Sequence, residues 1–169
     1  KIIFSTLSVA GRKSFKEMNP VDVLVVDEAG QSVEAETLIP FVTKPKKCLL
    51  IGDTNQLPAT VISQDAEQRG FGRSLLFRLL ENCKQPYTLL DVQYRMHPAI
   101  SRWPSDRYYD GKIKDDVSVI APRENIFMAQ EVIPRFIQPY AFIDVNGIEE
   151  KSYGQSYFNK LECEYVSLM

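Results

Sequence analysis

The sequence predicts an α/β fold in which a parallel sheet is flanked by helices. Three continuous apolar runs lie early in the chain, at Ile2–Phe4, Val21–Val26 and Cys48–Ile51. Unbroken apolar runs, as opposed to alternating ones, are typical of strands buried on both faces, as in parallel sheets. Segments of helical character separate the later runs, and strands that alternate with helices indicate a sheet covered on both sides.

Local signals predict the next elements along the chain. Ser32–Ile39 is expected to be a helix that Pro40 ends, since proline cannot donate a hydrogen bond in a helix interior. Ser74–Asn82 is expected to be a second helix with Ser74 as its N-cap. Thr88–Leu90 begins a fourth apolar run and is expected to be a strand.

The second half of the chain has weaker patterns. Pro98–Gly111 is dense in proline, aromatic and charged residues, which predicts irregular or short-helical structure, and Pro122–Pro139 is interpreted as a mobile surface connection. Tyr140–Val145 predicts one more strand, and Asn159 with Glu162 three residues later resembles a capping box. The helix that follows would have an apolar face at i, i+4 and i+7, formed by Leu161, Tyr165 and Leu168.

Composition indicates a globular chain that is not strongly basic. Of its 169 residues, 44% are hydrophobic and 25% charged, and no apolar run approaches the ~20 residues of a membrane span. Twenty basic and 22 acidic residues give a net charge of −2. Binding of nucleic acid by bulk charge is therefore not expected, and any such binding must come from local patches or from outside this chain. Lys1 at the start and a helix continuing to Met169 suggest a segment of a longer protein.

Cysteine usage excludes the usual zinc sites. Cys48, Cys83 and Cys163 form no Cys-x-x-Cys pair, and the chain has a single histidine, His97. Scattered cysteines of this kind suit a reducing compartment, and we interpret all three as buried or bystander thiols.

Two adjacent carboxylates, Asp27 and Glu28, directly follow the apolar run that ends at Val26. Ligands of open α/β sheets bind at the carboxyl ends of the strands. Such a pair can share the work of phosphoryl transfer: Asp27 would hold Mg²⁺ through water, and Glu28 would orient and deprotonate the attacking water. The alternative is a solvated acidic loop that opens a helix, whose N-terminus favours negative charge.

A second polar string, Gly52–Thr60, follows the next apolar run. Gly52 permits a tight turn, Asp53 stands at the strand tip, and Gln56 is a neutral amide that can touch a phosphate oxygen or the attacking water. Glycine, aspartate and proline are also common turn residues, which is the alternative interpretation. Two polar strand tips in succession nevertheless favour a site over two ordinary turns.

A third string is Gln93–Pro98. The planar guanidinium of Arg95 can bind phosphate oxygens and stabilise charge that develops on them, and Tyr94 offers a flat face for a base. Alternatively, the arginine is a surface residue and the tyrosine a core residue. His97, followed by proline, is interpreted as structural and not catalytic.

In this order and at these spacings, the three strings resemble motifs II, III and IV of superfamily 1 helicases, in the subgroup of the nonsense-mediated-decay helicase and senataxin. The resemblance extends to further segments, which are Phe4–Gly11, Gly70–Leu75, Trp103–Gly111 and Ser156–Glu162, but does not cover Pro122–Pro139. One motif is missing, because the chain contains no Gly-x-x-x-x-Gly-Lys-Ser/Thr loop. Its only Gly-Lys pair, Gly111-Lys112, has Asp106 at the position of the first glycine.

The resemblance implies a RecA-like P-loop NTPase fold, with residues 1–90 ending the first motor domain and residues 91–169 beginning the second. ATP would bind between the two, together with Mg²⁺ at Asp27. Glu28 and Gln56 would be catalytic, and Arg95 would act as an arginine finger. The implied ATP-binding residues are Asp27, Gln31, Asp53, Gln56, Tyr94 and Arg95. Ser5 and Thr6 would touch the nucleic-acid backbone.

The implied activity is that of an ATP-dependent helicase, which couples hydrolysis of Mg-ATP to translocation along and unwinding of RNA or an RNA/DNA hybrid, 5′→3′. Its partners would be single-stranded RNA or DNA and the rest of the helicase chain, with the phosphate-binding loop upstream and the remaining second motor domain downstream. No membrane partner is implied, and the location is intracellular, with the nucleus favoured over the cytoplasm.

Without a phosphate-binding loop, these 169 residues alone are expected to be inactive as an ATPase. The alternative function is a non-catalytic scaffold that keeps the helicase fold to bind nucleic acid or protein. Retention of Asp27, Glu28, Gln56 and Arg95 favours the enzyme, because a scaffold has no need of all four.

Overall fold

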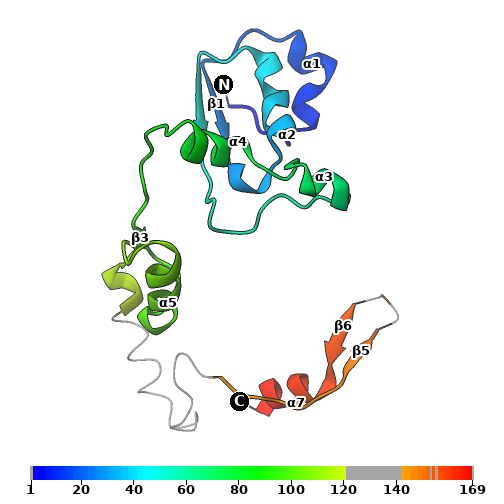
Figure 1. Ribbon diagram of the computed structural model, residues 1–169, viewed down its shortest axis with the longest axis vertical. Coiled ribbons are helices and arrows are strands. Elements are labelled where there is room, and N and C mark those ends of the chain that lie inside the picture. Colours follow the sequence, from blue (N-terminus) through cyan, green and yellow to red (C-terminus); the bar gives the residue numbers. More distant parts are fainter. Residues whose placement is uncertain (1, 121–141, 153, 155, 169) are drawn as a thin grey trace. The chain divides into compact units, whose positions relative to one another are not determined.

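The structure is a computed structural model that describes residues 2–120, 142–152, 154 and 156–168 (Figure 1). Contacts between residues divide the chain into two compact units, Lys1–Thr88 and Leu89–Met169, and each is described by itself. The predicted connection at Pro122–Pro139 and the first two residues of the predicted strand Tyr140–Val145 lie outside the described residues.

The first unit is a two-stranded parallel sheet with short helices packed around it (Figure 1). The strands are β1 (Val23–Val26) and β2 (Lys47–Leu50). The α-helices are α1 (Lys13–Lys16), α2 (Glu34–Leu38), α3 (Gln64–Gln68) and α4 (Leu75–Phe77). The 3-10 turns are η1 (Val9–Gly11), η2 (Ala29–Gln31) and η3 (Ile39–Thr43), and α4 continues as a π-helical turn, η4 (Arg78–Asn82).

Two of the three strands predicted for this unit are confirmed, as is the Ser74 cap. Residues of β1 and β2 pair in parallel, with Val26 opposite Leu50, and the Ser74 hydroxyl accepts a hydrogen bond from the Phe77 amide at 3.1 Å. The strand predicted at Ile2–Phe4 is wrong, since the described part of that run pairs with nothing and Phe4 is 92% exposed.

The helix predicted at Ser32–Ile39 is present in a shorter form, and its α-helical part ends at Leu38, just before Pro40 as predicted. The helix after Ser32 begins at Glu34, and the chain then passes directly from α2 into η3. Pro40 lies in the first turn of η3, where a missing N–H removes no helical hydrogen bond.

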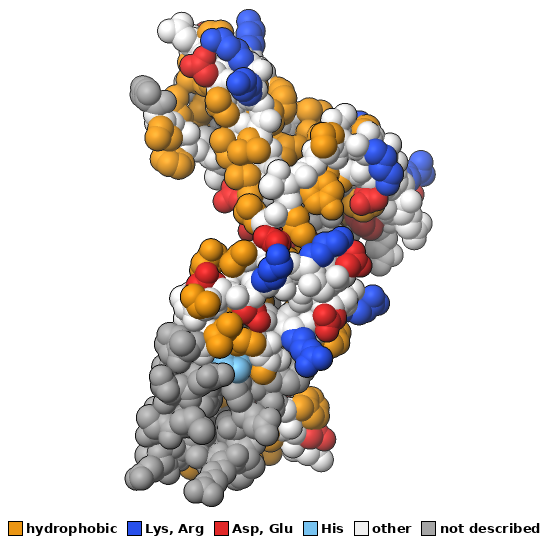
Figure 2. Space-filling model, turned by 90° about the vertical axis from the view of Figure 1, so that its left-hand side faces the viewer, with side chains coloured by type: hydrophobic (Ala, Val, Ile, Leu, Met, Phe, Trp, Pro, Cys, Tyr) orange, Lys and Arg blue, Asp and Glu red, His pale blue; other side chains and the backbone are white. Residues whose placement is uncertain are grey.

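Only one face of this sheet is covered within the described chain. Val26 packs with Ala29 and with Leu76 of α4 in the core. On the opposite face, Val25 and Leu49 are about half exposed, at 53% and 52%, and hydrophobic side chains gather on the surface of this unit in the upper part of Figure 2. The unbroken apolar runs predict burial on both faces, and among the described residues only one face is covered, because no described element packs on the second.

The second unit begins with a strand–helix–strand motif. Its parallel strands are β3 (Val92–Gln93) and β4 (Lys114–Asp115), and the helix between them is α5 (Pro98–Tyr108). The later elements are an antiparallel pair, β5 (Glu149–Lys151) and β6 (Tyr157–Asn159), and the helix α7 (Lys160–Leu168).

Three predictions for this unit are wrong. The strand expected at Thr88–Leu90 lies instead at Val92–Gln93, where it can pair with β4. Pro98–Tyr108 is a regular α-helix, because Pro98 occupies its first turn and the His97 ring nitrogen Nδ1 accepts a hydrogen bond from the Ala99 amide at 3.1 Å. Residues 142–145 form no strand.

The cap predicted for the last helix is confirmed. The Asn159 side-chain oxygen accepts from the Glu162 amide at 3.3 Å, and its side-chain nitrogen donates to the Glu162 carboxylate at 2.8 Å. In a usual capping box the glutamate would instead accept from the backbone N–H of the cap residue.

The loops that follow β1 and β2 meet backbone to backbone. A Cβ atom at Gly30 would lie 2.5 Å from the carbonyl oxygen of Asp53, and a Cβ at Gly52 would lie 2.8 Å from the amide nitrogen of Gly30. The Ala29 amide donates to the Ile51 carbonyl at 2.8 Å across the same contact. Glycine is thus required at both positions by close approach, and the two strand tips are held together.

A bidentate ion pair joins segments that are far apart in the first unit. The Nε and Nη2 atoms of Arg78 each donate to the Glu34 carboxylate at 2.8 Å, which ties η4 to α2. The hydrogen-bonded guanidinium holds the pKa of Glu34 below its ordinary value. The side chains are 35% and 29% exposed, so solvent screens the pair in part.

Alanine at Gly30 or Gly52 should destabilise the chain by about 1–3 kcal/mol each, since the added methyl group meets backbone that cannot move aside. Denaturant unfolding of the purified chain measures this. The matched control is Gly72→Ala, whose methyl group would meet only the movable end of the Glu67 side chain. Equal losses at all three positions would show that the strand tips are not specially constrained.

Replacing Glu34 with glutamine should lower the free energy of unfolding at neutral pH by about 1 kcal/mol. Because the pKa of Glu34 is lower in the folded chain, the pair stabilises above the ordinary glutamate pKa and loses this effect as pH falls through the folded value. Unfolding curves between about pH 7 and about pH 3 should therefore converge for the two proteins. Glu81→Gln, which breaks the exposed pair with Lys84, should have a much smaller effect.

Candidate active site

The tip of β1 carries the first predicted pair of carboxylates. Asp27 and Glu28 follow the strand directly, and both are exposed. Glu28 has a left-handed backbone, with φ 52° and ψ 38°, a region uncommon for residues other than glycine. Such strained residues concentrate at functional sites, where the surrounding structure enforces them.

Hydrogen bonds fix how these carboxylates point. Asp27 Oδ1 accepts from the Glu28 amide at 3.0 Å, and Glu28 Oε2 accepts from the side-chain amide of Gln31 at 3.0 Å. The turn η2 creates the second contact, because it brings the third residue after Glu28 back beside it. Both donors are neutral amides, so they orient the carboxylates without pairing them with a positive charge.

The tip of β2 repeats this arrangement. Asp53 Oδ1 accepts from the Asn55 amide at 2.9 Å, and its Oδ2 accepts from the Gln56 side-chain amide at 2.9 Å. In each loop a carboxylate is thus bound by a glutamine three residues later. Because β1 and β2 are parallel neighbours, both loops lie at the same edge of the sheet.

This edge has the chemistry of a magnesium–phosphate site. Among the ion pairs of the described residues, none joins Asp27 or Glu28 to a cation. The described residues also contain no group of three or more acidic, histidine or cysteine side chains that could hold a metal alone. Mg²⁺ fits such a site, since it commonly uses one or two carboxylates and completes its shell with water and substrate phosphates.

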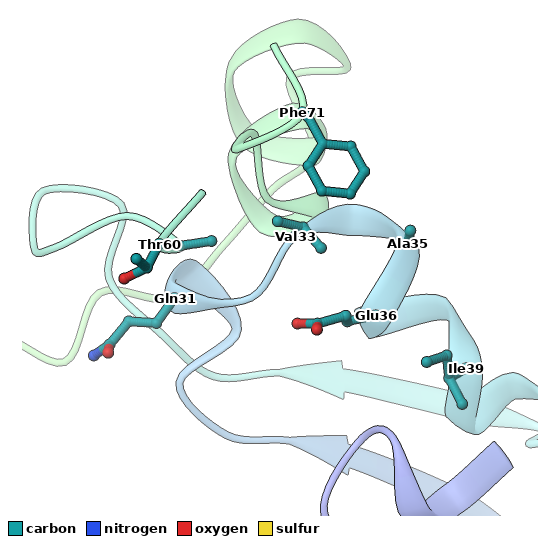
Figure 3. A pocket seen from close by; sticks show the side chains of 8 residues that line it. Gln31, Val33, Ala35, Glu36, Ile39, Thr60 and Phe71 are labelled. Carbon is teal, nitrogen blue, oxygen red and sulfur yellow. The ribbon is translucent and has the colours of Figure 1, made fainter. Parts of the chain in front are cut away.

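A separate hollow of about 420 Å³ lies between α2 and the loops containing Thr60 and Phe71 (Figure 3). Of the predicted site residues only Gln31 lines it. The Glu36 carboxylate also lines it, and this negative charge disfavours nucleotide phosphates. The hollow is therefore adjacent to the strand-tip site and not part of it.

The remaining predicted ATP-binding residues, Tyr94 and Arg95, belong to the second unit, where both are exposed. They stand in the turn between β3 and α5, a position equivalent to that of Glu28 after β1. The sequence interpretation gave no role to Gln93, although its side chain makes most of the hydrogen bonds that shape this turn. In the sequence, Gln93 stands directly before the predicted functional residues, but nothing there indicates its hydrogen-bond partners.

Ser5 and Thr6, predicted to touch nucleic acid, are exposed and open the turn η1. The Ser5 hydroxyl donates to the Thr6 carbonyl at 2.9 Å, and the Thr6 hydroxyl accepts from the Val9 amide at 3.4 Å. These contacts define an ordinary turn, and a nucleic-acid role for either residue stays a prediction.

Two simpler predictions concern His97 and the cysteines. His97 caps α5, which confirms its structural role. Cys48, Cys83 and Cys163 are free and exposed, so of the two roles expected for them only that of bystander thiols fits.

Comparison with known proteins identifies the family. Two family models, each described as AAA domain, match residues 1–64 and 71–169. Helicase sen1 of Schizosaccharomyces pombe is 37% identical over 98% of this chain, and probable helicase senataxin of Homo sapiens is 36% identical over 98%. DNA-binding protein SMUBP-2 of Mesocricetus auratus is 47% identical over 60% of the chain.

The chain spans only 10%, 6% and 10% of the length of these relatives, respectively. Within the part of the chain that the structure describes, no helix has the length and apolar character needed to cross a bilayer. Three findings agree on the family of the chain: the matched AAA domains, the parallel strands with carboxylates at their tips, and the named helicase relatives. This chain belongs to the superfamily 1 helicases with AAA domains, in the group that contains senataxin.

Proposed function

We propose that the chain is the central part of an ATP-dependent nucleic-acid helicase and supplies the water-activating half of its ATP site. The observation that carries this proposal is the pair of strand-tip loops, in which Glu28 and Asp53 are each oriented by a glutamine at the same edge of the sheet. The phosphate-binding loop would come from outside the chain. The chain alone should therefore not hydrolyse ATP.

Each strand-tip residue has a role that its contacts support. Asp27 would hold Mg²⁺ through water, and the ion, when bound, neutralises charge on the phosphates. Glu28 is exposed, and Gln31 orients its carboxylate. A base that accepts a proton from the attacking water needs both access to water and a fixed orientation. The Asp53 carboxylate holds the side-chain amide of Gln56. A phosphate that displaced this amide would alter the conformation of the loop and so transmit nucleotide binding to the rest of the domain.

The second unit would contribute the groups that complete the site. Arg95 would act as an arginine finger and Tyr94 would pack on the adenine, with residues 1–90 and 91–169 belonging to the two motor domains. Ser5 and Thr6 would contact the nucleic-acid backbone. We propose single-stranded RNA or DNA as partner, RNA or an RNA/DNA hybrid as the unwound substrate, 5′→3′ movement and a nuclear location, as the resemblance of the motifs to this group of helicases implies.

A non-catalytic scaffold is the competing function. A scaffold would not need an exposed carboxylate at position 28 whose orientation is set by a hydrogen bond from Gln31. Assays of the full-length protein that carries this chain decide between the two.

Glu28→Gln in the full-length protein should lower kcat for ATP by about 10²–10⁴-fold and leave ATP binding intact. The amide keeps the shape of the side chain but cannot accept the proton from water. Steady-state turnover and nucleotide titration on one preparation measure both effects. Glu36→Gln, an exposed carboxylate of α2 that lines the separate hollow, should leave kcat unchanged. If the two variants had similar turnover, Glu28 would not be the base.

Arg95→Ala should lower kcat by about 10³-fold or more, with a smaller effect on ATP affinity, since a finger acts mainly on charge in the transition state. Arg95→Lys should restore little, because an ammonium group does not reproduce the planar fork. Arg102→Ala removes an exposed arginine of α5 and serves as the control for loss of positive charge. A destabilised but fully active Arg95→Ala protein would show that this arginine only packs.

A further inference from the structure

The side chain of Gln93 organises the turn that carries Tyr94 and Arg95. Its Oε1 atom accepts two backbone hydrogen bonds, from the Arg95 amide at 2.8 Å and from the Met96 amide at 2.7 Å. Its Nε2 atom donates to the Met96 carbonyl at 2.7 Å. One amide group therefore closes the turn from both sides, with its acceptor and its donor both in use.

The Gln93 amide is itself anchored to the rest of the unit. Its Nε2 atom also donates to the Asp115 carboxylate on β4, 22 residues away in the sequence. The same carboxylate oxygen accepts from the hydroxyl of Ser101, a buried residue of α5, at 2.6 Å. The backbone carbonyl of Gln93 accepts from the Asp116 amide at 3.0 Å, which fixes the main chain at the same point.

We propose that Gln93 is a positioning residue that holds the backbone of Arg95 in place, and that Asp115 and Ser101 anchor it. This inference rests on the proposed finger role of Arg95. The Arg95 side chain is exposed, and within the described part of the chain the contact that orients this residue is the hydrogen bond from its backbone amide to Gln93. The Gln93–Asp115–Ser101 network thus links β3, α5 and β4 to the reacting end of the turn.

The chemistry of the network explains why an amide is needed. Position 93 must accept from two backbone amides and also donate to a carboxylate, and only a group with both functions can do so. A carboxylate there would keep the two accepted bonds but would lose both donated bonds, so that it would oppose the Met96 carbonyl and Asp115. Displacement of a catalytic group by about 1 Å can cost roughly 10²-fold in rate, so a looser turn should be visible in kcat.

The test exchanges the two groups of the network in the full-length protein. Gln93→Glu should lower kcat for ATP by about 10–100-fold with KM for ATP nearly unchanged. Adding Asp115→Asn restores a donor opposite the carboxylate at position 93, and the Ser101 hydroxyl, which faces the same atom at position 115, can accept the second hydrogen of that amide while it donates to the Pro98 carbonyl. The double variant should have a kcat at least about tenfold higher than that of Gln93→Glu alone, because the turn is again held in position. The control is Asp106→Asn, which removes the charge of an exposed carboxylate of α5. It should leave kcat unchanged both in the wild type and in Gln93→Glu.

A second comparison separates positioning from general stability. In an Arg95→Ala background, Gln93→Glu should have almost no further effect on kcat, because the group that it positions is absent. The positioning role would be overturned if Gln93→Glu and Arg95→Ala lowered kcat independently, so that their effects multiplied. It would also be overturned if adding Asp115→Asn to Gln93→Glu restored no kcat. If Arg95→Ala itself kept normal kcat, the finger assignment would fail first. If Arg95→Ala were slow and Gln93→Glu were normal, only the present inference would fail.

Discussion

Direct contact between two backbone loops is the constraint on which the proposed site depends. Gly30 and Gly52 leave no room for a side chain between the ends of β1 and β2. The contact does more than pack the sheet, since it fixes where the chain turns after each strand. Asp27 and Glu28 on one loop and Asp53 on the next are thereby brought to a single edge. The left-handed backbone of Glu28 is a consequence of this turn, and the hydrogen bond from Ala29 to Ile51 secures it.

The carboxylates of the chain are used in two different ways. Glu34 is neutralised by the bidentate Arg78, and the pair joins α2 to η4 as a structural element. Glu28 is instead held by the amide of Gln31, which orients the carboxylate without compensating its charge. Retained negative charge at a strand tip suits a hydrated metal ion, which can in turn neutralise a phosphate. The contrast separates acids that stabilise the unit from acids that are available for chemistry.

Polar contacts also dominate the second unit. The buried face of α5 carries Ser101 and Ser105, whose hydroxyls donate to Asp115 and to the Ile113 carbonyl at the start of β4. Among the described residues, every buried side-chain nitrogen or oxygen has a hydrogen-bond partner. A polar interface of this kind is directional, because its hydrogen bonds form only in one register. It can therefore hold the turn with Tyr94 and Arg95 more specifically than apolar packing of so small a unit could.

The sequence by itself determined the α/β class, the strands β1 and β2, the Ser74 and Asn159 caps and the family, because these depend on local patterns and on motif order. It did not determine which apolar runs become strands. Ile2–Phe4 and Thr88–Leu90 are apolar enough, but a strand forms only where a partner supplies hydrogen bonds, as β4 does for β3. Local composition likewise hid α5, in which Pro98 lies in the first turn next to the His97 cap and Pro104 lies inside the helix. The role of Gln93 was also beyond the sequence, since its partner Asp115 is adjacent only after the chain has crossed from β3 through α5 to β4.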